Sequence, residues 1–347
     1  MKKLLFAIGA LALVSCGSSK DAANDPNVDY AVKYAETITE KDLAKHLFIY
    51  ASDEFEGRNT GEPGQKKAVE YLKKFYQSNG IKSPLGGNDY FQDVPSEYLS
   101  NNRRGMTLKD SENVVAFIEG SEKPEEILVI SAHLDHEGVK NGEIYNGADD
   151  DGSGTVAMLE IAEAFQKAVK AGKRPKRSIL FLHVTGEEKG LLGSKYYTEN
   201  PIFPLANTVT NLNIDMVGRI DPKRTEGDRN YIYLIGADKL STELHNVSEA
   251  VNKKYTNVEL DYKYNDENDP NRFYYRSDHY NFAKHNIPII FYFNGTHDDY
   301  HRPSDTPDKI NYDLLENRTR LIFYTAWELA NRDKRVVVDK AETETKK

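Results

Sequence analysis

The sequence predicts an α/β fold with a largely parallel, mixed central sheet and helices on both of its faces. Two observations predict this fold. Apolar runs of strand length alternate with stretches of helical periodicity, and polar side chains recur directly after the apolar runs. A chain of 347 residues, 39% of them hydrophobic, can also bury a full-sized core.

Five apolar runs are typical of strands that are buried on both faces of a sheet. In chain order they are 126–132, 178–185, 209–215, 231–236 and 287–293. Because such strands alternate with helical segments, we expect them to lie mostly parallel in one sheet.

The helical segments carry their own start and stop signals. Thr39, with Asp42 three residues later, is a plausible N-cap for a first helix. Pro63 and Gly80 bracket a second helix, since proline suits the first turn and glycine the position after the last. Further helices are predicted over residues 153–171, 241–255 and 312–331, and residues 81–112 are expected to form a loop.

The N-terminal residues are typical of an export signal. After Lys2 and Lys3, an apolar stretch from Leu4 to Val14 is shorter than the roughly 20 residues that span a bilayer. It ends in LVSC, and Cys16 is the only cysteine of the chain. This tetrad resembles the lipobox of bacterial lipoproteins, which implies cleavage before Cys16 and a membrane-anchoring lipid on its side chain; the alternative is a plain signal peptide.

We therefore divide the chain into a lipoprotein signal peptide (1–15), a flexible tether (16–30), one catalytic domain (31–334) and a disordered tail (335–347). The expected location is the bacterial cell envelope, at the outer membrane, on its periplasmic or its surface face. A formal charge of −9 argues against nucleic acid as a partner. The oligomeric state stays open, with a monomer favoured.

Polar side chains follow the predicted strands, where ligands bind in sheets of this kind. His133 and Asp135 follow the first strand, Asp215 ends the third, and His301 lies a few residues beyond the fifth. Glu187 and Glu188 follow the second strand. Each of these residues alone could be a buried histidine, a cap or a solvated turn. Together they indicate a cation site, because so many carboxylates cannot share a crevice without positive charge.

The triplet Asp149–Asp151 belongs to the same edge and has two competing interpretations. One is a solvated turn. The other is a calcium loop, because residues 149–160 match the pattern D-x-D-x-S-G-x₅-E, which ends at Glu160. A calcium loop of that type lies between two helices, however, and here a strand and a glycine-containing loop precede the triplet. We reject the calcium loop.

The donor types favour zinc, or failing that manganese or cobalt, since imidazoles and carboxylates are present without thiolates. Two histidines and three or more carboxylates exceed the three protein ligands of a single catalytic zinc. They suit two ions about 3.5–4 Å apart, with one carboxylate shared and a further glutamate free as general base.

The segments AHLDH, NGADDDGSG, TGEEKGLLGS, NIDMVGR, RSDHYNF and DYHRPSDT resemble, in this order, the motifs of metallopeptidase family 28, the co-catalytic zinc aminopeptidases. ASDEFEGRNTGEPG, over residues 51–64, resembles an upstream signature of its bacterial members. The resemblance covers about residues 45–331. It implies the zinc-exopeptidase fold, which is phosphorylase/hydrolase-like.

The resemblance also implies roles for individual residues. Asp150 would bridge two Zn²⁺ ions, Glu188 and His301 would complete one ion's ligands, and His133 and Asp215 those of the other. Glu187 would be the general base. Asp135 would orient His133 through its other ring nitrogen. Tyr300 or His279 would donate a hydrogen bond to the oxyanion.

The resemblance further implies a cis peptide bond between Asp150 and Asp151. Asp151 would shape that peptide, and Asp149 would be replaceable.

The implied activity is hydrolysis of the N-terminal peptide bond of peptides with a free amino end. Three alternatives stay open. A single-zinc glutaminyl cyclase has the same fold, and a metal-free binding module would need lost ligands. A carboxypeptidase would need a cation for the substrate carboxylate, which Arg276 or Arg302 could supply.

Overall fold

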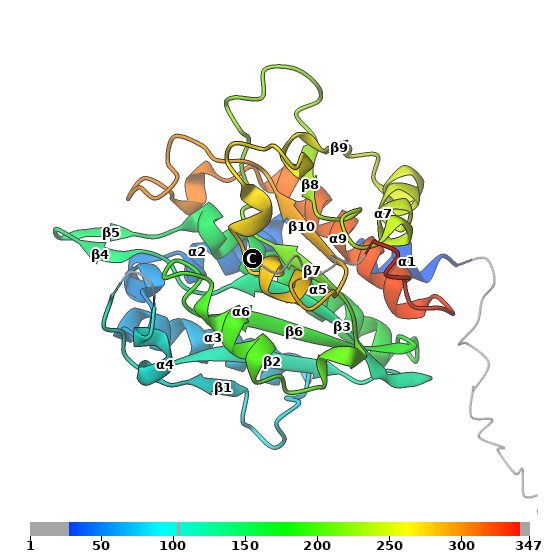
Figure 1. The fold of residues 1–347 in the computed structure, drawn as a ribbon, viewed down its shortest axis with the longest axis horizontal. Helices are drawn as coiled ribbons and strands as arrows, with labels where there is room; N and C mark the ends of the chain where they lie inside the picture. Colours follow the sequence, from blue (N-terminus) through cyan, green and yellow to red (C-terminus); the bar gives the residue numbers. More distant parts are fainter. Residues whose placement is uncertain (1–27, 103–104, 341–347) are drawn as a thin grey trace, which may run out of the picture.

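The central sheet of the protein has eight strands in a computed structural model that describes residues 28–102 and 105–340. Their order is β1-β2-β6-β3-β7-β10-β8-β9 (Figure 1). The strands are β1 (Phe91–Val94), β2 (Ser111–Ile118), β3 (Lys123–His133), β6 (Arg177–Val184), β7 (Thr208–Ile214), β8 (Tyr231–Ile235), β9 (Glu259–Asp261) and β10 (Ile289–Phe293).

The sheet is mixed, as predicted, and its parallel part is central. Strands β6, β3, β7 and β10 are successive parallel neighbours. The antiparallel pairs are β1 with β2, β2 with β6, and β10 with β8, while β8 and β9 are parallel. The parallel strands end together at one edge of the sheet, which is where the polar clusters were expected.

Helices cover both faces. They are α1 (Tyr30–Ala35), α2 (Glu40–Tyr50), α3 (Pro63–Asn79), α4 (Ser96–Ser100), α5 (Gly154–Lys170), α6 (Leu192–Glu199), α7 (Thr242–Tyr255), α8 (His279–Ala283) and α9 (Tyr312–Asn331). A hairpin of β4 (Gly138–Lys140) and β5 (Glu143–Tyr145) projects from the body at the left of Figure 1. Two irregular helical turns, η1 (Asp53–Arg58) and η2 (Ala148–Ser153), lie near the carboxyl edge of the parallel strands.

Side chains of successive strand residues enter two different cores, since they alternate between the faces of the sheet. The larger core joins the sheet to α1, α2, α3, α5, α7 and α9, and the smaller one joins it to α6 and α8. In β3, Leu128 and Ile130 face the larger core, and Ile127 and Val129 face the smaller one. Burial on both faces explains why the central strands read as continuous apolar runs.

The five predicted strands and the helix signals are found in the structure. The Thr39 side chain accepts from the Asp42 backbone amide, and Gly80 ends α3 in the left-handed region at φ 74°. The predicted loop 81–112 is wrong in part, because it contains β1 and α4 and the first residues of β2. β1 is a four-residue edge strand with one buried side chain, so it lacks an apolar run that sequence could reveal.

The ordered body extends into both the predicted tether (16–30) and the predicted disordered tail (335–347). α1 begins at Tyr30, with the Asp29 side chain capping it, so the ordered body starts inside the predicted tether. Residues 335–340, expected to be disordered, pack on the body: Val336 is buried, and Asp339 donates its amide to Leu240. The predicted signal peptide, Cys16 and residues 341–347 lie outside the described residues. Within the described residues, every helix is too short or too polar to cross a bilayer.

Candidate metal centre

The predicted polar residues meet at the carboxyl edge of the parallel strands. His133 is the last residue of β3, Asp215 follows β7, and Glu188 follows β6 by a short loop. His301 lies in the segment after β10, and Asp150 lies in η2, which leads into α5. Segments up to 168 residues apart in the sequence thus contribute to one cluster, since His133 and His301 both reach Asp150.

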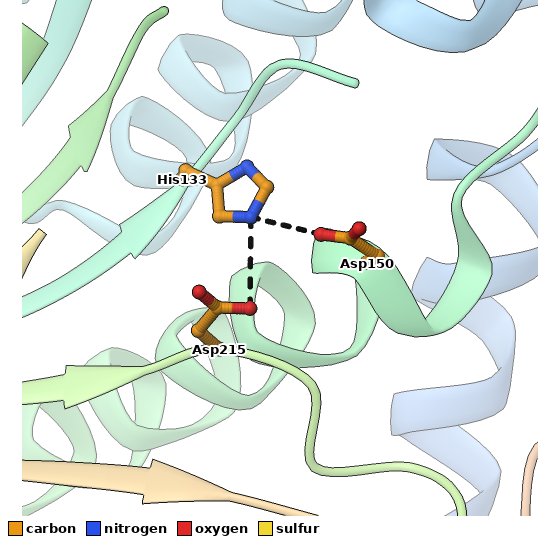
Figure 2. Close-up of side chains that lie close together, drawn as sticks. All are labelled: His133, Asp150 and Asp215. Atoms are coloured by element: carbon orange, nitrogen blue, oxygen red, sulfur yellow. Dashed lines mark ion pairs between the residues drawn. The ribbon is translucent and has the colours of Figure 1, made fainter. Parts of the chain in front are cut away.

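One group of three residues surrounds His133. Its Nε2 lies 3.0 Å from Oδ1 of Asp150 and 3.6 Å from Oδ1 of Asp215 (Figure 2). All three side chains are buried and point toward one another from β3, from η2 and from the end of β7.

A second group uses the other oxygen of Asp150. Nε2 of His301 lies 2.9 Å from Oδ2 of Asp150 and 3.2 Å from Oε2 of Glu188. Nδ1 of His136 lies 2.9 Å from Oε1 of the same glutamate. Asp150 therefore presents one carboxylate oxygen to each group.

The donor set fits a divalent metal. Nε2 of His133, Nδ1 of His136 and Nε2 of His301 face these carboxylates but make no hydrogen bond with the described residues. Burial lowers the pKa of His301, but Asp150 and Glu188 outweigh it and raise that pKa to about 10. The cluster thus requires positive charge, and imidazole nitrogens and carboxylate oxygens are the donors that zinc takes in catalytic sites.

Asp305 fixes the position of the Asp150 backbone. Its Oδ2 accepts the backbone amides of Asp149 at 3.0 Å and of Asp150 at 3.2 Å, and its carbonyl accepts the amide of Ala148. The Asp150–Asp151 peptide bond is cis, as the resemblance implied. These contacts leave both Asp150 carboxylate oxygens directed to the histidines.

The structure changes the expectation for Asp149. We predicted that this residue would be replaceable, but its side chain is fully buried and accepts from four groups. Oδ1 accepts from the Gly218 amide at 2.7 Å and from Ser153 Oγ at 2.9 Å. Oδ2 lies 3.1 Å from Asn294 Nδ2 and 3.1 Å from His297 Nε2. Asp149 joins the turn to the segments after β7 and after β10 and is not a spare carboxylate.

Asp151 joins the same turn to the neighbouring strands. Its Oδ1 accepts the amides of Gly154 at 2.9 Å and Met216 at 3.1 Å, and its Oδ2 accepts the His133 amide at 3.2 Å. The three aspartates thus point in different directions, so their negative charges have different partners.

The acceptor that orients His133 differs from the expected one. Nδ1 of His133 lies 3.0 Å from the backbone carbonyl of Asp135 but 3.9 Å from its carboxylate. The carboxylate instead accepts from Thr60 Oγ1 at 2.9 Å and from the Glu187 amide at 3.0 Å. Asp135 therefore fixes the loop that carries Glu187, and its main chain orients His133.

Glu187 and Tyr300 line the cavity beside the cluster. The other lining residues are Asp150, Asp215, Met216, Phe273, Arg276, Phe291, Phe293 and Thr296. Burial raises the pKa of Glu187 well above its usual range, and nearby carboxylates act in the same direction. The Tyr300 ring stacks on that of His301, with 3.9 Å between the centroids.

His279, the weaker oxyanion candidate, lies elsewhere. It is fully buried, its ring stacks on Phe291, and its Nε2 lies 2.7 Å from the Tyr274 carbonyl. Burial lowers its pKa to about 3. His279 is a core histidine behind the cavity wall and does not line the cavity. Of the two candidate arginines, Arg276 lines the cavity and Arg302 does not.

The upstream segment at residues 51–64 supports the site from behind. The Arg58 side chain is fully buried and donates to the backbone carbonyls of Tyr50, Leu134, Asn146 and Gly147. It thereby joins the loop after β3 to the segment before η2. This contact gives a structural reason for a signature so far from the metal ligands.

Sequence reasoning missed three residues of the site: His136, His297 and Asp305. His136 stands inside the first quoted motif, but its neighbour His133 already supplied the expected ligand. His297 and Asp305 flank His301 in the last polar segment. The sequence shows that this segment is rich in polar residues. The spacing of those residues does not show which side chains point toward the metal cluster.

Comparison with known proteins agrees with this geometry. The family model described as Peptidase family M28 matches residues 113–326. A leupeptin-inactivating enzyme from Streptomyces exfoliatus is 30% identical over 51% of this chain and 35% of its own length. Aminopeptidase NAALADL1 from the rat is 35% identical over 32% of this chain and 14% of its own length. The chain thus spans well under two thirds of these relatives.

Solved structures with the same fold belong to more than one kind of enzyme. LapA aminopeptidase of Legionella pneumophila is 22% identical, with a TM-score of 0.65 and coverage of 96% of this chain and 81% of its own. A glutaminyl cyclase of Porphyromonas gingivalis is 18% identical, with a TM-score of 0.66 and coverage of 84% and 98%. At these identities the likeness establishes the fold only. The family model, which covers more than half of the chain, establishes that the protein belongs to Peptidase family M28, whose zinc-dependent members hydrolyse peptides.

Proposed function

We propose that the protein is a di-zinc aminopeptidase that removes the first residue of peptides with a free amino end. The observation that carries the proposal is the arrangement around Asp150. One of its oxygens lies 3.0 Å from His133, and the other lies 2.9 Å from His301. A carboxylate placed between two histidine–carboxylate groups is what a shared ligand of two ions requires.

When bound, two zinc ions supply a Lewis acid for the scissile carbonyl and lower the pKa of a shared water. His133 and Asp215 would hold one ion, Glu188 and His301 the other, and Asp150 both. Glu187 lines the cavity, and we propose that its carboxylate takes the proton of the attacking water and passes it to the leaving amine.

Tyr300 lines the same cavity and is the candidate donor to the oxyanion. Phe273, Phe291, Phe293 and Met216 give the cavity an apolar wall, so we expect an apolar first residue to be preferred.

One observation favours a second candidate, a carboxypeptidase. The guanidinium of Arg276 lies 4.8 Å from the centroid of the Phe273 ring, at the cavity. An arginine there could bind a substrate carboxylate in bidentate fashion. With a dipeptide the same contact would serve an aminopeptidase, because the free carboxylate of the second residue then also lies near the scissile bond.

A peptide with different residues at its two ends distinguishes the candidates. Zinc-loaded protein should release the first residue of the free peptide, detected by mass spectrometry, and should leave the N-acetylated peptide intact. Release of the last residue instead would support the carboxypeptidase. Cyclisation of an N-terminal glutamine without hydrolysis of other peptides would support a glutaminyl cyclase.

The role of Glu187 is tested in the same assay. Glu187→Gln should lower kcat by about 10²–10⁴-fold and leave the zinc content unchanged. Glu199→Gln, a change at an exposed glutamate, is the matched control and should keep full activity. Unchanged turnover in Glu187→Gln would exclude it as the base.

A further inference from the structure

His136 lies beside the second group of ligands. It belongs to the loop after β3 and is fully buried. Its Nδ1 lies 2.9 Å from Oε1 of Glu188 and 3.8 Å from Oδ2 of Asp150, and its ring meets that of His301 edge to face at 5.6 Å. The side chain therefore faces the same carboxylates as His301 from another direction.

The distances between these atoms match the spacing of ligands around one ion. His136 and His301 lie 2.9–3.8 Å from the oxygens of Asp150 and Glu188. A tetrahedral zinc ion with bonds of about 2.0–2.1 Å separates neighbouring ligand atoms by about 3.3 Å. Donor atoms of His136, Asp150 and Glu188 lie within 4.8 Å of one another, and His301 faces the same two carboxylates, so one ion held by these carboxylates is within reach of both imidazoles.

The His136 ring has no other hydrogen-bonding role. Neither ring nitrogen makes a hydrogen bond with a described residue. The one polar group that Nδ1 faces at close range is the Glu188 carboxylate, at 2.9 Å, so the role of Nδ1 has to be sought at this carboxylate.

The surroundings also hold the His136 ring in place. The His136 amide donates to the Arg58 carbonyl. A Cβ at Gly147 would lie 2.4 Å from the ring's Cγ, so only glycine leaves room for the ring there. Local packing therefore fixes the direction in which Nδ1 points.

Glu137 is the other side chain that could complete this group, since one of its oxygens lies near Glu188 and His301. It is partly exposed, however, and its Oε2 pairs with Lys140. His136 is buried and points inward, so the geometry favours the imidazole over this carboxylate.

We propose that His136 is a fourth protein ligand of the ion held by Asp150, Glu188 and His301. The proposal rests on the metal centre of the proposed function. It makes the two metal positions unequal, because the position at His133 and Asp215 has three protein ligands and keeps a place open for water or substrate. The ion at His136 should therefore bind more tightly and leave last during chelation.

Zinc affinity tests this assignment without relying on activity. Metal-free protein is titrated with zinc against a chromophoric chelator, and the absorption spectrum of the cobalt-loaded protein is recorded. His136→Gln should weaken one of two sites by at least about 10-fold and change the cobalt spectrum. His183→Gln removes another fully buried histidine, whose Nε2 lies 2.7 Å from the Tyr76 hydroxyl, and should preserve both sites.

A folded His136→Gln variant, checked by circular dichroism, with unchanged zinc affinities and cobalt spectrum would overturn the assignment. X-ray absorption of the zinc-loaded wild type gives a second test, which stands even if the variant does not fold. A total of three imidazole ligands for the two zinc ions supports His136 as a ligand. A total of two excludes it and leaves His136 as an ion-pair partner of Glu188.

The outcomes also separate this proposal from the proposed function. If the wild type binds a single zinc ion, the two-ion proposal fails. His136 is then judged by whether that ion has two imidazole ligands or one. If zinc binding follows the expectation but no peptide is cleaved, the ligand assignment holds and the aminopeptidase proposal fails.

Discussion

Two buried acidic regions lie close together in the sequence and differ in how their charge is balanced. The aspartates of η2 accept backbone amides and face histidines of distant segments. Glu160, on α5, is equally buried, but its Oε1 has no hydrogen-bond partner, and the nearest cation candidate is His46 Nε2 at 3.7 Å. Burial raises the pKa of Glu160 to about 8 and lowers that of His46.

The difference shows what distinguishes a metal site from an isolated buried acid. An isolated carboxyl can stay neutral by keeping its proton. The η2 cluster has too many carboxylates for that solution, and it brings imidazoles to meet them. The comparison also argues against the calcium loop. In such a loop Glu160 would bind the same ion as Asp149 and Asp151, but the Glu160 side chain faces His46 on another helix.

The largest effect is expected where both metal groups share a residue. Asp150→Asn should remove zinc from both positions and lower peptidase activity at least about 10³-fold, because the ions contribute several kcal/mol to catalysis. Zinc per chain is measured by mass spectrometry after dialysis. Asp308→Asn, at an exposed aspartate, is the control. Retention of two zinc ions by Asp150→Asn would show that this residue is not the shared ligand.

Asp149 should affect folding more than metal binding. Asp149→Asn would turn an amide donor toward Asn294 and His297, or toward Gly218 and Ser153, where donors already point. We expect a loss of about 3 kcal/mol in the free energy of unfolding, measured with urea, with two zinc ions still bound by the folded fraction. Normal stability together with lost zinc would reverse the roles given to Asp149 and Asp150.

Replacing Glu160 should increase the free energy of unfolding, whereas replacing Asp149 should decrease it. Its folded-state pKa of about 8 lies above the unfolded value, so unfolding releases its proton between about pH 4.5 and 8. Its contribution to stability is therefore complete below that range and is lost as the pH rises to 8. Glu160→Gln should stabilise the protein by about 2 kcal/mol at pH 8 and change little at pH 4.5.

The matched control for Glu160 is Glu328→Gln, a change at an exposed glutamate of α9. It should alter the pH dependence of unfolding much less. If Glu160→Gln destabilises the protein at pH 8, the carboxylate is ionised and favourably paired, which contradicts the contrast with the cluster.

The smallest effect concerns the support of a metal ligand. Ser277 donates to Oδ2 of Asp215 at 2.6 Å and accepts from Asn213 Nδ2 at 2.8 Å. Ser277→Ala should weaken zinc at the His133 position about 10-fold, because the carboxylate loses an orienting donor. Zinc affinity measured as for His136 checks this, and Ser304→Ala, a surface change, is the control. An unchanged affinity would mean that packing alone orients Asp215.

The sequence allowed much of the fold and the outline of the site to be predicted. The central strands are buried on both faces, so their apolar runs stand out, and parallel strands necessarily bring their carboxyl ends together. This logic led to His133, Asp215 and His301 and to the clusters at 149–151 and 187–188, and the family resemblance then implied Asp150 and Glu188 as the ligands within those clusters. It did not reveal β1, whose four edge residues carry little apolar signal.

Side-chain direction was the part that sequence could not supply. His279 stands in a motif that resembles the family pattern, yet it packs behind Phe291. His136 stands one residue from Asp135 and turns into the metal cluster. Asp149 and Asp150 are adjacent, yet one joins segments of the fold and the other faces two histidines. Such choices depend on contacts between distant segments, which no spacing in the chain reports.

The most direct test is the anomalous diffraction of crystals of the zinc-loaded protein, recorded above and below the zinc absorption edge. The account predicts two peaks about 3.5–4 Å apart, one between His133 and Asp215 and one between Glu188 and His301, with the Asp150 carboxylate between them. A single peak, or two peaks that share no contact with Asp150, would contradict it.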